Sequence, residues 1–277
     1  MMKLLKSLLP YIPGAKFLLM PLRFYNALKV YHRLPSQILS WVFTSQEWTN
    51  ITYELTDLNK KYLTCFISQI TNTDREKVRE YLEELENDDN LKKHIQETTL
   101  KSPRSFISDA EARYGRRLGW YALVRIKKPK IVVETGVDKG LGSVVLAVAL
   151  MKNAEEGFNG HLYCTDYNPE AGFLLTEPYS SYGTIIYGDS IETLKSFDRG
   201  IDILITDSDH KFNYELQEYE TVEKQLQEGF LIISDTAHYS STLIKFAESR
   251  NLKFLFFQEQ PKDIWFPGGG IGIAYQD

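Results

Sequence analysis

The sequence predicts an α/β fold: a doubly wound, mostly parallel sheet of seven strands, preceded by an N-terminal helical extension. From Lys130 onward, short runs rich in β-branched residues alternate with helix-length stretches, which is the pattern of successive βα units. Most of these runs are apolar throughout, so we expect a parallel sheet covered by helices on both faces. The seven strand-like runs are IVVETG (131–136), HLYCTD (161–166), TIIYGD (184–189), IDILITD (201–207), FLIISD (230–235), LKFLFFQ (252–258) and GIGIAYQ (270–276).

The last two runs differ from the others in how they are joined. Only a short stretch rich in proline and glycine separates them, and it leaves no room for a crossover helix. We therefore expect these two strands to form an antiparallel pair. A dinucleotide-binding Rossmann domain would instead continue with another parallel strand.

Length and composition limit the domain organisation and the class of function. The chain has 277 residues, 43% of them hydrophobic and 25% charged, which allows one large α/β domain and an extension. We place the boundary between an N-terminal helical region, residues 1–104, and the α/β domain, residues 105–277. The net charge of −5 argues against a general nucleic-acid binder.

Cysteine content and hydropathy bear on the cellular compartment. Cys65 and Cys164 are the only cysteines, too few for a disulfide framework. No run approaches the roughly 18 apolar residues of a membrane-spanning helix, and Pro10, Pro13 and Lys16 interrupt any signal-peptide core. We expect a cytoplasmic protein.

Residues 1–46 contain no Asp or Glu. They combine aromatic and aliphatic side chains with six basic ones, which leaves two interpretations open. The segment is either a helical arm that packs on its own domain or on a second subunit, or an amphipathic segment that lies on an anionic membrane. The basic residues are Lys3, Lys6, Lys16, Arg23, Lys29 and Arg33.

Two helix starts are predicted between this segment and the first strand. Thr73-Asp74-Arg75-Glu76 and Ser108-Asp109-Ala110-Glu111 both fit the capping box, in which a hydroxyl and a carboxylate satisfy each other's backbone donors. The second helix is expected to carry Leu118, Trp120 and Leu123 and to end at Pro129.

Polar and glycine residues follow the first strand, where ligands bind in doubly wound sheets. The segment Glu134-Thr135-Gly136-Val137-Asp138-Lys139-Gly140-Leu141-Gly142-Ser143 allows a tight turn, and the following helix N-terminus can bind a carboxylate or phosphate. Alone, such a turn serves NAD, a phosphate or close packing. Its ExGxxxGxG spacing resembles the first motif of class I S-adenosylmethionine-dependent methyltransferases. The resemblance implies that Glu134, Gly136, Gly140, Gly142 and Ser143 bind this cofactor.

Acids also end the second and third strands. Asp166 is placed to accept the ribose hydroxyls of a cofactor, or else it is a turn residue before Asn168-Pro169. Asp189, followed by Ser190, is placed beside the adenine, or else it is the N-cap of the next helix. Three acids after three successive strands are more specific together than any one alone.

The ends of the fourth and fifth strands, Asp207-Ser208-Asp209-His210 and Asp235-Thr236, sharpen the resemblance. They are similar to the metal-dependent O-methyltransferases, which include catechol, caffeoyl-CoA and macrolide sugar enzymes. The resemblance covers about Arg113 to the C-terminus. It implies a divalent cation such as Mg²⁺ on Asp207, Asp235 and Thr236, although Thr236 stands where the family has Asn or Asp. It also implies contact between Asp207 and the cofactor.

These residues suit the chemistry of hydroxyl methylation. An alcohol is a weak nucleophile at neutral pH, so the enzyme must orient its oxygen and remove a proton. His210 is the predicted base, and Asp207 is the second predicted catalytic residue. The loop that contains Trp265, Phe266 and Gly268–Gly270 either stacks on a sugar or ring or covers the core.

We therefore predict a metal-assisted O-methyltransferase that acts on a hydroxyl of a sugar or small natural product. Two alternatives stay open: a metal-independent methyltransferase in which His210 acts alone, and a nucleotide- or NAD-binding oxidoreductase. A non-catalytic partner subunit would be expected to have lost the strand-end acids, and they are all present.

Overall fold

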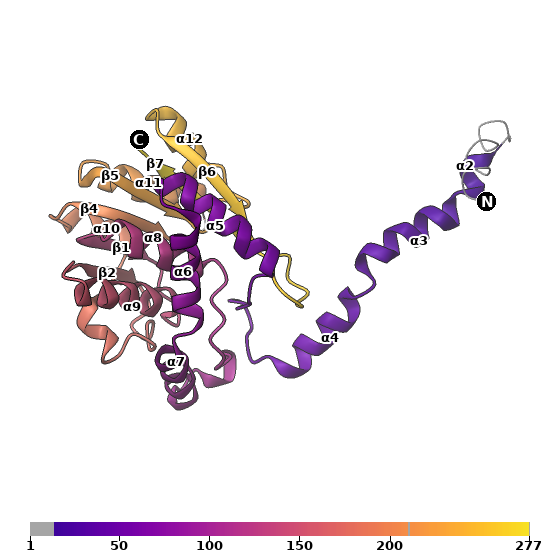
Figure 1. Cartoon of the computed structure of the whole chain (residues 1–277), viewed down its shortest axis with the longest axis horizontal. Helices are drawn as coiled ribbons and strands as arrows, with labels where there is room; N and C mark the ends of the chain where they lie inside the picture. The colour runs from indigo at the N-terminus through magenta and orange to yellow at the C-terminus, as the bar shows by residue number, and fades with distance from the viewer. Residues whose placement is uncertain (1–13, 210, 277) are drawn as a thin grey trace. The chain divides into compact units, whose positions relative to one another are not determined.

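The computed structural model describes residues 14–209 and 211–276, and Figure 1 shows their helices and strands. By its contacts the chain divides into two units. One comprises the residues up to Ser45 together with Asp263–Trp265, and the other comprises Gln46–Lys262 and Phe266–Asp277. Residues 57–101, which precede the predicted boundary at residue 104, therefore belong to the larger unit. No helix of the described ranges is long and apolar enough to cross a membrane.

One sheet organises the larger unit. Its strand order is β3-β2-β1-β4-β5-β7-β6; β1 to β5 pair in parallel, and β7 runs antiparallel to both β5 and β6. The predicted mostly parallel sheet and its final antiparallel pair are thus confirmed. The strands are β1 (Ile131–Thr135), β2 (His161–Asp166), β3 (Gly183–Tyr187), β4 (Ile201–Thr206), β5 (Leu226–Ser234), β6 (Lys253–Gln258) and β7 (Gly270–Tyr275).

Helices cover both faces of this sheet (Figure 1). Mutual contacts join α5, α6, α8 and α9 into one group, and α10, α11 and α12 into another. The run LGSVVLAVALM has no polar face because α9 packs between α8, β2 and the turn Tyr179–Tyr182. The helices are α5 (Asp57–Thr71), α6 (Arg75–Glu86), α7 (Asp89–Lys101), α8 (Arg117–Lys127), α9 (Leu141–Glu155), α10 (Ser190–Ser196), α11 (Phe212–Val222) and α12 (Thr242–Ser249).

Both predicted capping boxes are wrong in detail. The N-cap of α6 is Asp74, whose carboxylate accepts the backbone N–H of Glu76 at 2.7 Å, while the Thr73 hydroxyl donates to a backbone carbonyl before the helix. An Asp beside a Thr can take the same role, and here it does. Residues 108–111 open no helix, because α8 begins only at Arg117.

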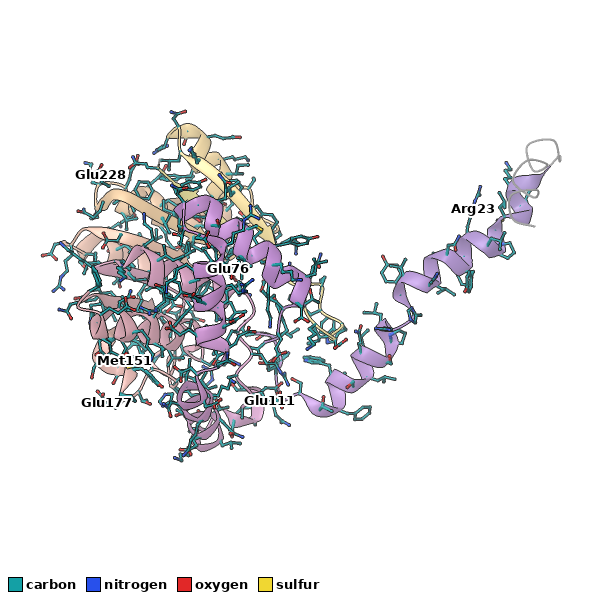
Figure 2. The ribbon with its side chains drawn as sticks, viewed as in Figure 1. Arg23, Glu76, Glu111, Met151, Glu177 and Glu228 are labelled. Carbon is teal, nitrogen blue, oxygen red and sulfur yellow. The ribbon has the colours of Figure 1, made fainter. Side chains whose placement is uncertain are left out.

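Residues 14–45, called the arm below, contain α2 (Ala15–Leu18), α3 (Met20–Tyr31) and α4 (Leu34–Thr44). No residue of α3 or α4 is buried. Figure 2 draws the side chains and labels Arg23 on α3. Trp41 of α4 packs edge-on against Trp265, with ring centroids 5.3 Å apart.

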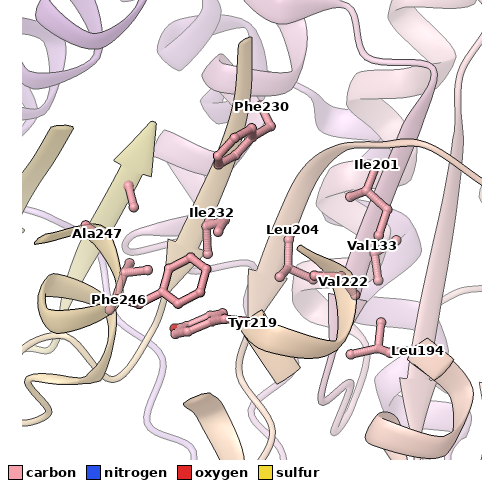
Figure 3. Close-up of a cluster of buried hydrophobic side chains, with 12 residues drawn as sticks. Val133, Leu194, Ile201, Leu204, Tyr219, Val222, Phe230, Ile232, Phe246 and Ala247 are labelled. Carbon is pink, nitrogen blue, oxygen red and sulfur yellow. The ribbon is translucent and has the colours of Figure 1, made fainter. Parts of the chain in front are cut away.

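A core between the sheet and α11 and α12 fixes the ends of β4 and β5 (Figure 3). The rings of Tyr219 and Phe246 lie at its centre, 5.3 Å apart. This packing orients the two strands whose carboxyl ends carry Asp207 and Asp235. The cluster consists of Val133, Leu194, Ile201, Leu204, Tyr219, Val222, Phe230, Ile232, Leu243, Phe246, Ala247 and Ala274.

The turn after β1 approaches the end of β4 so closely that only glycine fits. Gly136 has φ +84°, and a Cβ there would lie 2.0 Å from the carbonyl oxygen of Asp207. Gly157 has a similar φ of +89° but open space around it. We expect Gly157→Ala to lower the free energy of unfolding by about 1–2 kcal/mol, the cost of a left-handed residue. Gly136→Ala should lower it by about 1–3 kcal/mol more because the backbone must move. Equal losses in urea unfolding would contradict this close approach.

Candidate active site

The glycine-rich turn lies at the switch point of the sheet, where the strand order reverses between β1 and β4. A second segment covers it: Gly172 donates its N–H to the Asp138 carbonyl at 2.7 Å, and Leu174 donates to the Lys139 carbonyl at 3.1 Å. Gly140, at φ +90°, begins α9, and a Cβ there would lie 3.0 Å from the Gly172 Cα. The glycines of this turn therefore permit close backbone approach on two sides.

Glu134 lies beneath the turn and is 2% exposed. The hydroxyl of Ser143 donates to its carboxylate, as does the thiol of Cys164 at 3.3 Å. Burial raises the pKa of Glu134 to about 7, although the Ser143 and Cys164 hydrogen bonds act in the opposite direction. A Cβ at Gly142 would lie 2.3 Å from this carboxylate. Three of the five predicted cofactor residues of this motif, Glu134, Gly142 and Ser143, thus lie together, with the carboxylate packed under the helix start.

Asp166, at the end of β2, binds the same turn. Its Oδ2 accepts the backbone N–H groups of Val137 at 2.9 Å and Asp138 at 3.1 Å, and its Oδ1 accepts that of Asn168 at 2.8 Å. The turn interpretation accounts for the Asn168 bond. The carboxylate also joins the ends of β1 and β2, and each oxygen can accept more than one hydrogen bond.

Asp189 caps α10 by accepting the N–H of Glu192 at 3.0 Å, and it also accepts the Tyr214 hydroxyl at 2.9 Å. Ser190 donates to Glu218 at 2.6 Å, as does Ser208 at 2.7 Å. Burial raises the pKa of Glu218 to about 7. This contact could not be predicted from the sequence, since Glu218 resembles a solvent-facing helix residue.

Asp207 and Asp235 converge at the carboxyl ends of β4 and β5. Each continues its strand's pairing: the Asp207 N–H donates to the Thr135 carbonyl, and the Asp235 N–H donates to the Thr206 carbonyl. Burial, and then the neighbouring charge of Asp235, raises the pKa of Asp207 well above its ordinary value. Two carboxylates this close need a cation or a shared proton.

The cation beside them is Arg116, which immediately precedes α8. Its Nη2 donates to Oδ2 of Asp235 at 2.7 Å, and its Nε forms an ion pair with Oδ1 without a hydrogen bond, so the guanidinium faces both oxygens. The same group lies 4.0 Å from Asp207 Oδ2 and 3.6 Å from Glu259 Oε2. Burial alone would lower the pKa of Arg116, but Asp235, Glu259 and Asp207 outweigh it and the pKa is raised.

Glu259 extends this cluster toward the N-terminal segment. The Tyr53 hydroxyl donates to Glu259 Oε2 at 2.8 Å and accepts the N–H of Gly269 at 3.1 Å. Gly115, at φ +50°, allows the turn before Arg116 because a Cβ there would lie 3.1 Å from Glu259 and 3.3 Å from the Tyr53 ring. Residues from four distant parts of the chain thus meet around one guanidinium.

Thr236, the third predicted metal ligand, points elsewhere. Its hydroxyl donates to Glu215 Oε1 at 2.9 Å, and the Ser234 hydroxyl donates to the same oxygen at 2.5 Å. His210, the predicted base, lies outside the described residues. Among those that are described, no cluster of three or more His, Cys, Asp or Glu side chains is arranged to hold a metal ion.

The loop between β6 and β7 borders the Asp235 side of the site. His238 lies against Gly269, with its Nδ1 3.1 Å from the Asp235 carbonyl, and its ring packs edge-on against Tyr239 at 4.4 Å. Phe266 packs beside Tyr53 at 5.6 Å. Burial, then the charges of Asp235 and Asp207, raises the pKa of Tyr239 to about 12.

A second contact with the residues before the first strand joins Glu47 to Lys139 in the glycine-rich turn. Lys139 Nζ lies 3.0 Å from Glu47 Oε1, and both side chains are buried. Glu47 also accepts the Thr52 N–H at 2.7 Å and its hydroxyl at 2.6 Å. Sequence reasoning missed this pair and the Arg116 cluster. The only available signal was Thr236, whose departure from the family pattern pointed to a different cation arrangement.

The raised pKa of Glu134 predicts a pH-dependent stability. The folded state keeps a proton up to about pH 7 that the unfolded chain releases near pH 4.5. Stability from this residue is therefore complete below pH 4.5 and is lost as the pH rises through 7, by up to about 3 kcal/mol. We expect Glu134→Gln to lose less stability than the wild type between pH 5 and pH 8, by up to about 3 kcal/mol in urea unfolding, because the variant lacks this titrating group. The exposed Glu228→Gln should keep the wild-type slope, and a Glu134→Gln slope equal to it would refute the assignment.

Comparisons with known proteins agree with this geometry. Residues 133–236 match the family model of a methyltransferase domain, and a search of curated proteins gave no match. A solved structure from Klebsiella pneumoniae, described as an O-methyltransferase, is 16% identical with a TM-score of 0.51, covering 71% of this chain and 94% of that one. TomG of Streptomyces achromogenes, an O-methyltransferase of tomaymycin synthesis in complex with SAM, is 16% identical with a TM-score of 0.48, covering 69% and 90%. The matched stretch includes the strand ends that carry Asp166, Asp207 and Asp235 but not Arg116 or Glu259, and the sheet has the class I methyltransferase fold.

Proposed function

We propose that this protein is an S-adenosylmethionine-dependent O-methyltransferase whose acceptor site uses Arg116 as its cation. The acceptor is a hydroxyl of a small molecule, a sugar or a ring-containing natural product. The observation that carries the proposal is the contact of the Arg116 guanidinium with both oxygens of Asp235, beside Asp207 and Glu259. In this cluster a side chain stands where the resemblance places a divalent ion.

The residues after β1, β2 and β3 fit the methyl donor, whose sulfonium supplies an electrophilic methyl group. The first turn of α9 has backbone N–H groups without partners inside the helix, and these suit the donor's carboxylate. Asp166 and Asp189 lie at the ends of neighbouring strands, where they suit ribose hydroxyls and the adenine edge. Both oxygens of each carboxylate already accept a hydrogen bond, but a carboxylate oxygen can accept more than one, which leaves lone pairs for the donor.

A divalent cation fits the same cluster poorly. Both Asp235 oxygens face the Arg116 guanidinium, and the Thr236 hydroxyl is turned to Glu215. Mg²⁺ requires several oxygen ligands in octahedral geometry, and a guanidinium at the centre of the carboxylates repels it. We therefore favour the metal-independent alternative over the metal-assisted one and derive no step through a metal.

Arg116 then has an orienting and electrostatic role. A fixed guanidinium holds the Asp235 carboxylate and its neighbours in place without reorganisation during the reaction. An acceptor hydroxyl that donates to Asp207 is held by a group whose position the strand end fixes. His210, three residues beyond Asp207, remains the proposed proton acceptor.

The aromatic side chains around the cluster favour a ring or sugar as the acceptor. Tyr53, Phe266, His238 and Tyr239 border the Asp235 side and combine apolar faces with polar atoms. Such residues stack on rings while their polar atoms contact hydroxyl groups.

Chelation and the Arg116→Lys variant test this arrangement. We expect a chelator to leave wild-type methyl transfer unchanged. Arg116→Lys keeps the charge but loses the two-point contact with Asp235, so kcat should fall by about 10²-fold or more while donor affinity stays near the wild-type value. Turnover and donor binding by calorimetry would measure the two effects separately.

Arg116→Ala provides the converse experiment. With the guanidinium gone, Asp207, Asp235 and Glu259 lose the positive charge that compensates theirs, and a divalent ion can supply that charge once the carboxylates move closer together. Millimolar Mg²⁺ or Mn²⁺ should therefore raise the melting temperature of Arg116→Ala and leave that of the wild type unchanged. Wild-type activity that disappears in chelator and returns with Mg²⁺ would overturn the proposal and restore the metal-assisted mechanism.

A further inference from the structure

The arm exposes large apolar side chains over two successive helices. Phe24, Leu28 and Tyr31 of α3 are 67%, 51% and 62% exposed, and Val42 and Phe43 of α4 are exposed as well. None of the residues of α3 or α4 is buried. Surfaces of this kind on a folded protein mark an interaction site.

Most of the apolar side chains of α3 gather on one side of the helix. At about 100° per residue, Met20, Phe24, Ala27, Leu28 and Tyr31 fall at the i, i+4, i+7, i+8 and i+11 spacing of an apolar face. Together with Pro21 and Tyr25 they span an arc of about 160°. The opposite side holds Arg23, Asn26 and Lys29 together with the apolar Leu22 and Val30.

The two cations of α3 lie at the edges of this arc. Arg23 follows one edge and Lys29 the other, each about 40° beyond the last apolar residue. Long basic side chains in this position keep their stems on an apolar layer while their charged ends reach lipid headgroups. Figure 2 shows the side chain of Arg23 projecting from the helix.

The arrangement of α4 is similar but its polar side is uncharged. Leu34, Ile38, Trp41 and Val42 share one side at helical spacing, and Ser36, Ser40 and Thr44 share the other. The Ser36 and Thr44 hydroxyls donate to carbonyls of their own helical segment, at 2.8 Å each. The surface of α4 available to a partner is therefore mainly its apolar side, because these two hydroxyls are used within the segment itself.

The positive charge of the arm indicates which kind of partner its apolar face binds. The arm contains four basic residues and no acid, so its charge is +4. A second copy of the arm would bring the same charges and no carboxylate to pair with them. An anionic phospholipid surface supplies the opposite charge along with an apolar layer. Three of the six aromatic residues between Phe17 and Phe43 are Tyr or Trp, the types that favour the membrane–water interface, and the other three are Phe, which is common on the apolar face of surface-lying helices.

We propose that α3 and α4 lie in the headgroup region of an anionic lipid bilayer, with the apolar face of Met20, Phe24, Leu28 and Tyr31 toward the acyl chains. The arm thereby holds the protein at a membrane surface without crossing it. This inference does not depend on the reaction proposed above.

Vesicle co-sedimentation of the full chain tests the proposal. The protein should bind vesicles of phosphatidylglycerol and phosphatidylcholine, and bind pure phosphatidylcholine vesicles at least about tenfold more weakly at low salt. Phe24→Ser with Leu28→Ser should lower binding to the anionic vesicles by about tenfold or more, because two side chains leave the apolar layer.

Leu22→Ser with Val30→Ser is the matched control. It also removes two exposed apolar residues from α3, but both lie outside the apolar arc, so binding should change by less than about twofold. Arg23→Gln with Lys29→Gln should weaken binding to anionic vesicles alone. Equal binding by both serine pairs, or no binding to anionic vesicles at low salt, would overturn the proposal. So would a dimer in lipid-free solution that Phe24→Ser with Leu28→Ser dissociates, since a second copy would then be the partner.

Discussion

The candidate site is organised around the ion pairs that the Arg116 guanidinium forms with Asp207, Asp235 and Glu259. Asp207, Asp235 and Glu259 come from the ends of three different strands, and each is largely removed from water. Carboxylates in such surroundings repel one another and lose hydration. A buried cation with fixed donor geometry offsets both costs, and it dictates where α8 must begin. The turn at Gly115, the position of Tyr53 and the closeness of the β6–β7 loop follow from that placement.

The residues before the first strand therefore belong to the site. Tyr53 reaches Glu259, Asn59 exchanges hydrogen bonds with Gln258 and Gln260, and Glu47 pairs with Lys139 in the glycine-rich turn. Three of these hydrogen bonds span about 200 positions of sequence. A methyltransferase sheet without this segment would leave the Glu259 carboxylate and the Lys139 ammonium buried without these partners, which is costly.

The sheet could be predicted from the sequence because its signals are local. Apolar runs such as Ile201–Thr206 reveal strands, and parallel strands bring their carboxyl ends to one edge, so Asp166, Asp207 and Asp235 could be placed together. The place of Arg116 in the site could not be predicted, since this residue lies in a non-periodic turn and its partner Asp235 is 119 positions away. Glu215 and Glu218 were missed for a related reason. A glutamate on an amphipathic helix is expected to face solvent, and only the packed fold shows that both are buried. The predicted helix N-caps were wrong because Ser, Thr and Asp at adjacent positions can all serve as the N-cap.

An arginine in place of a divalent ion changes what the site can do to an acceptor. A metal ion binds a hydroxyl directly and lowers its pKa, whereas a guanidinium only donates hydrogen bonds and has no free coordination position. Proton removal then depends on a nearby base rather than on polarisation by the cation. In the proposed mechanism, the base must be positioned by the same strand end that holds the acceptor, and His210 would then carry out proton removal without help from a metal. The positions of the carboxylates then do not depend on the metal concentration, because the cation is a side chain of the protein.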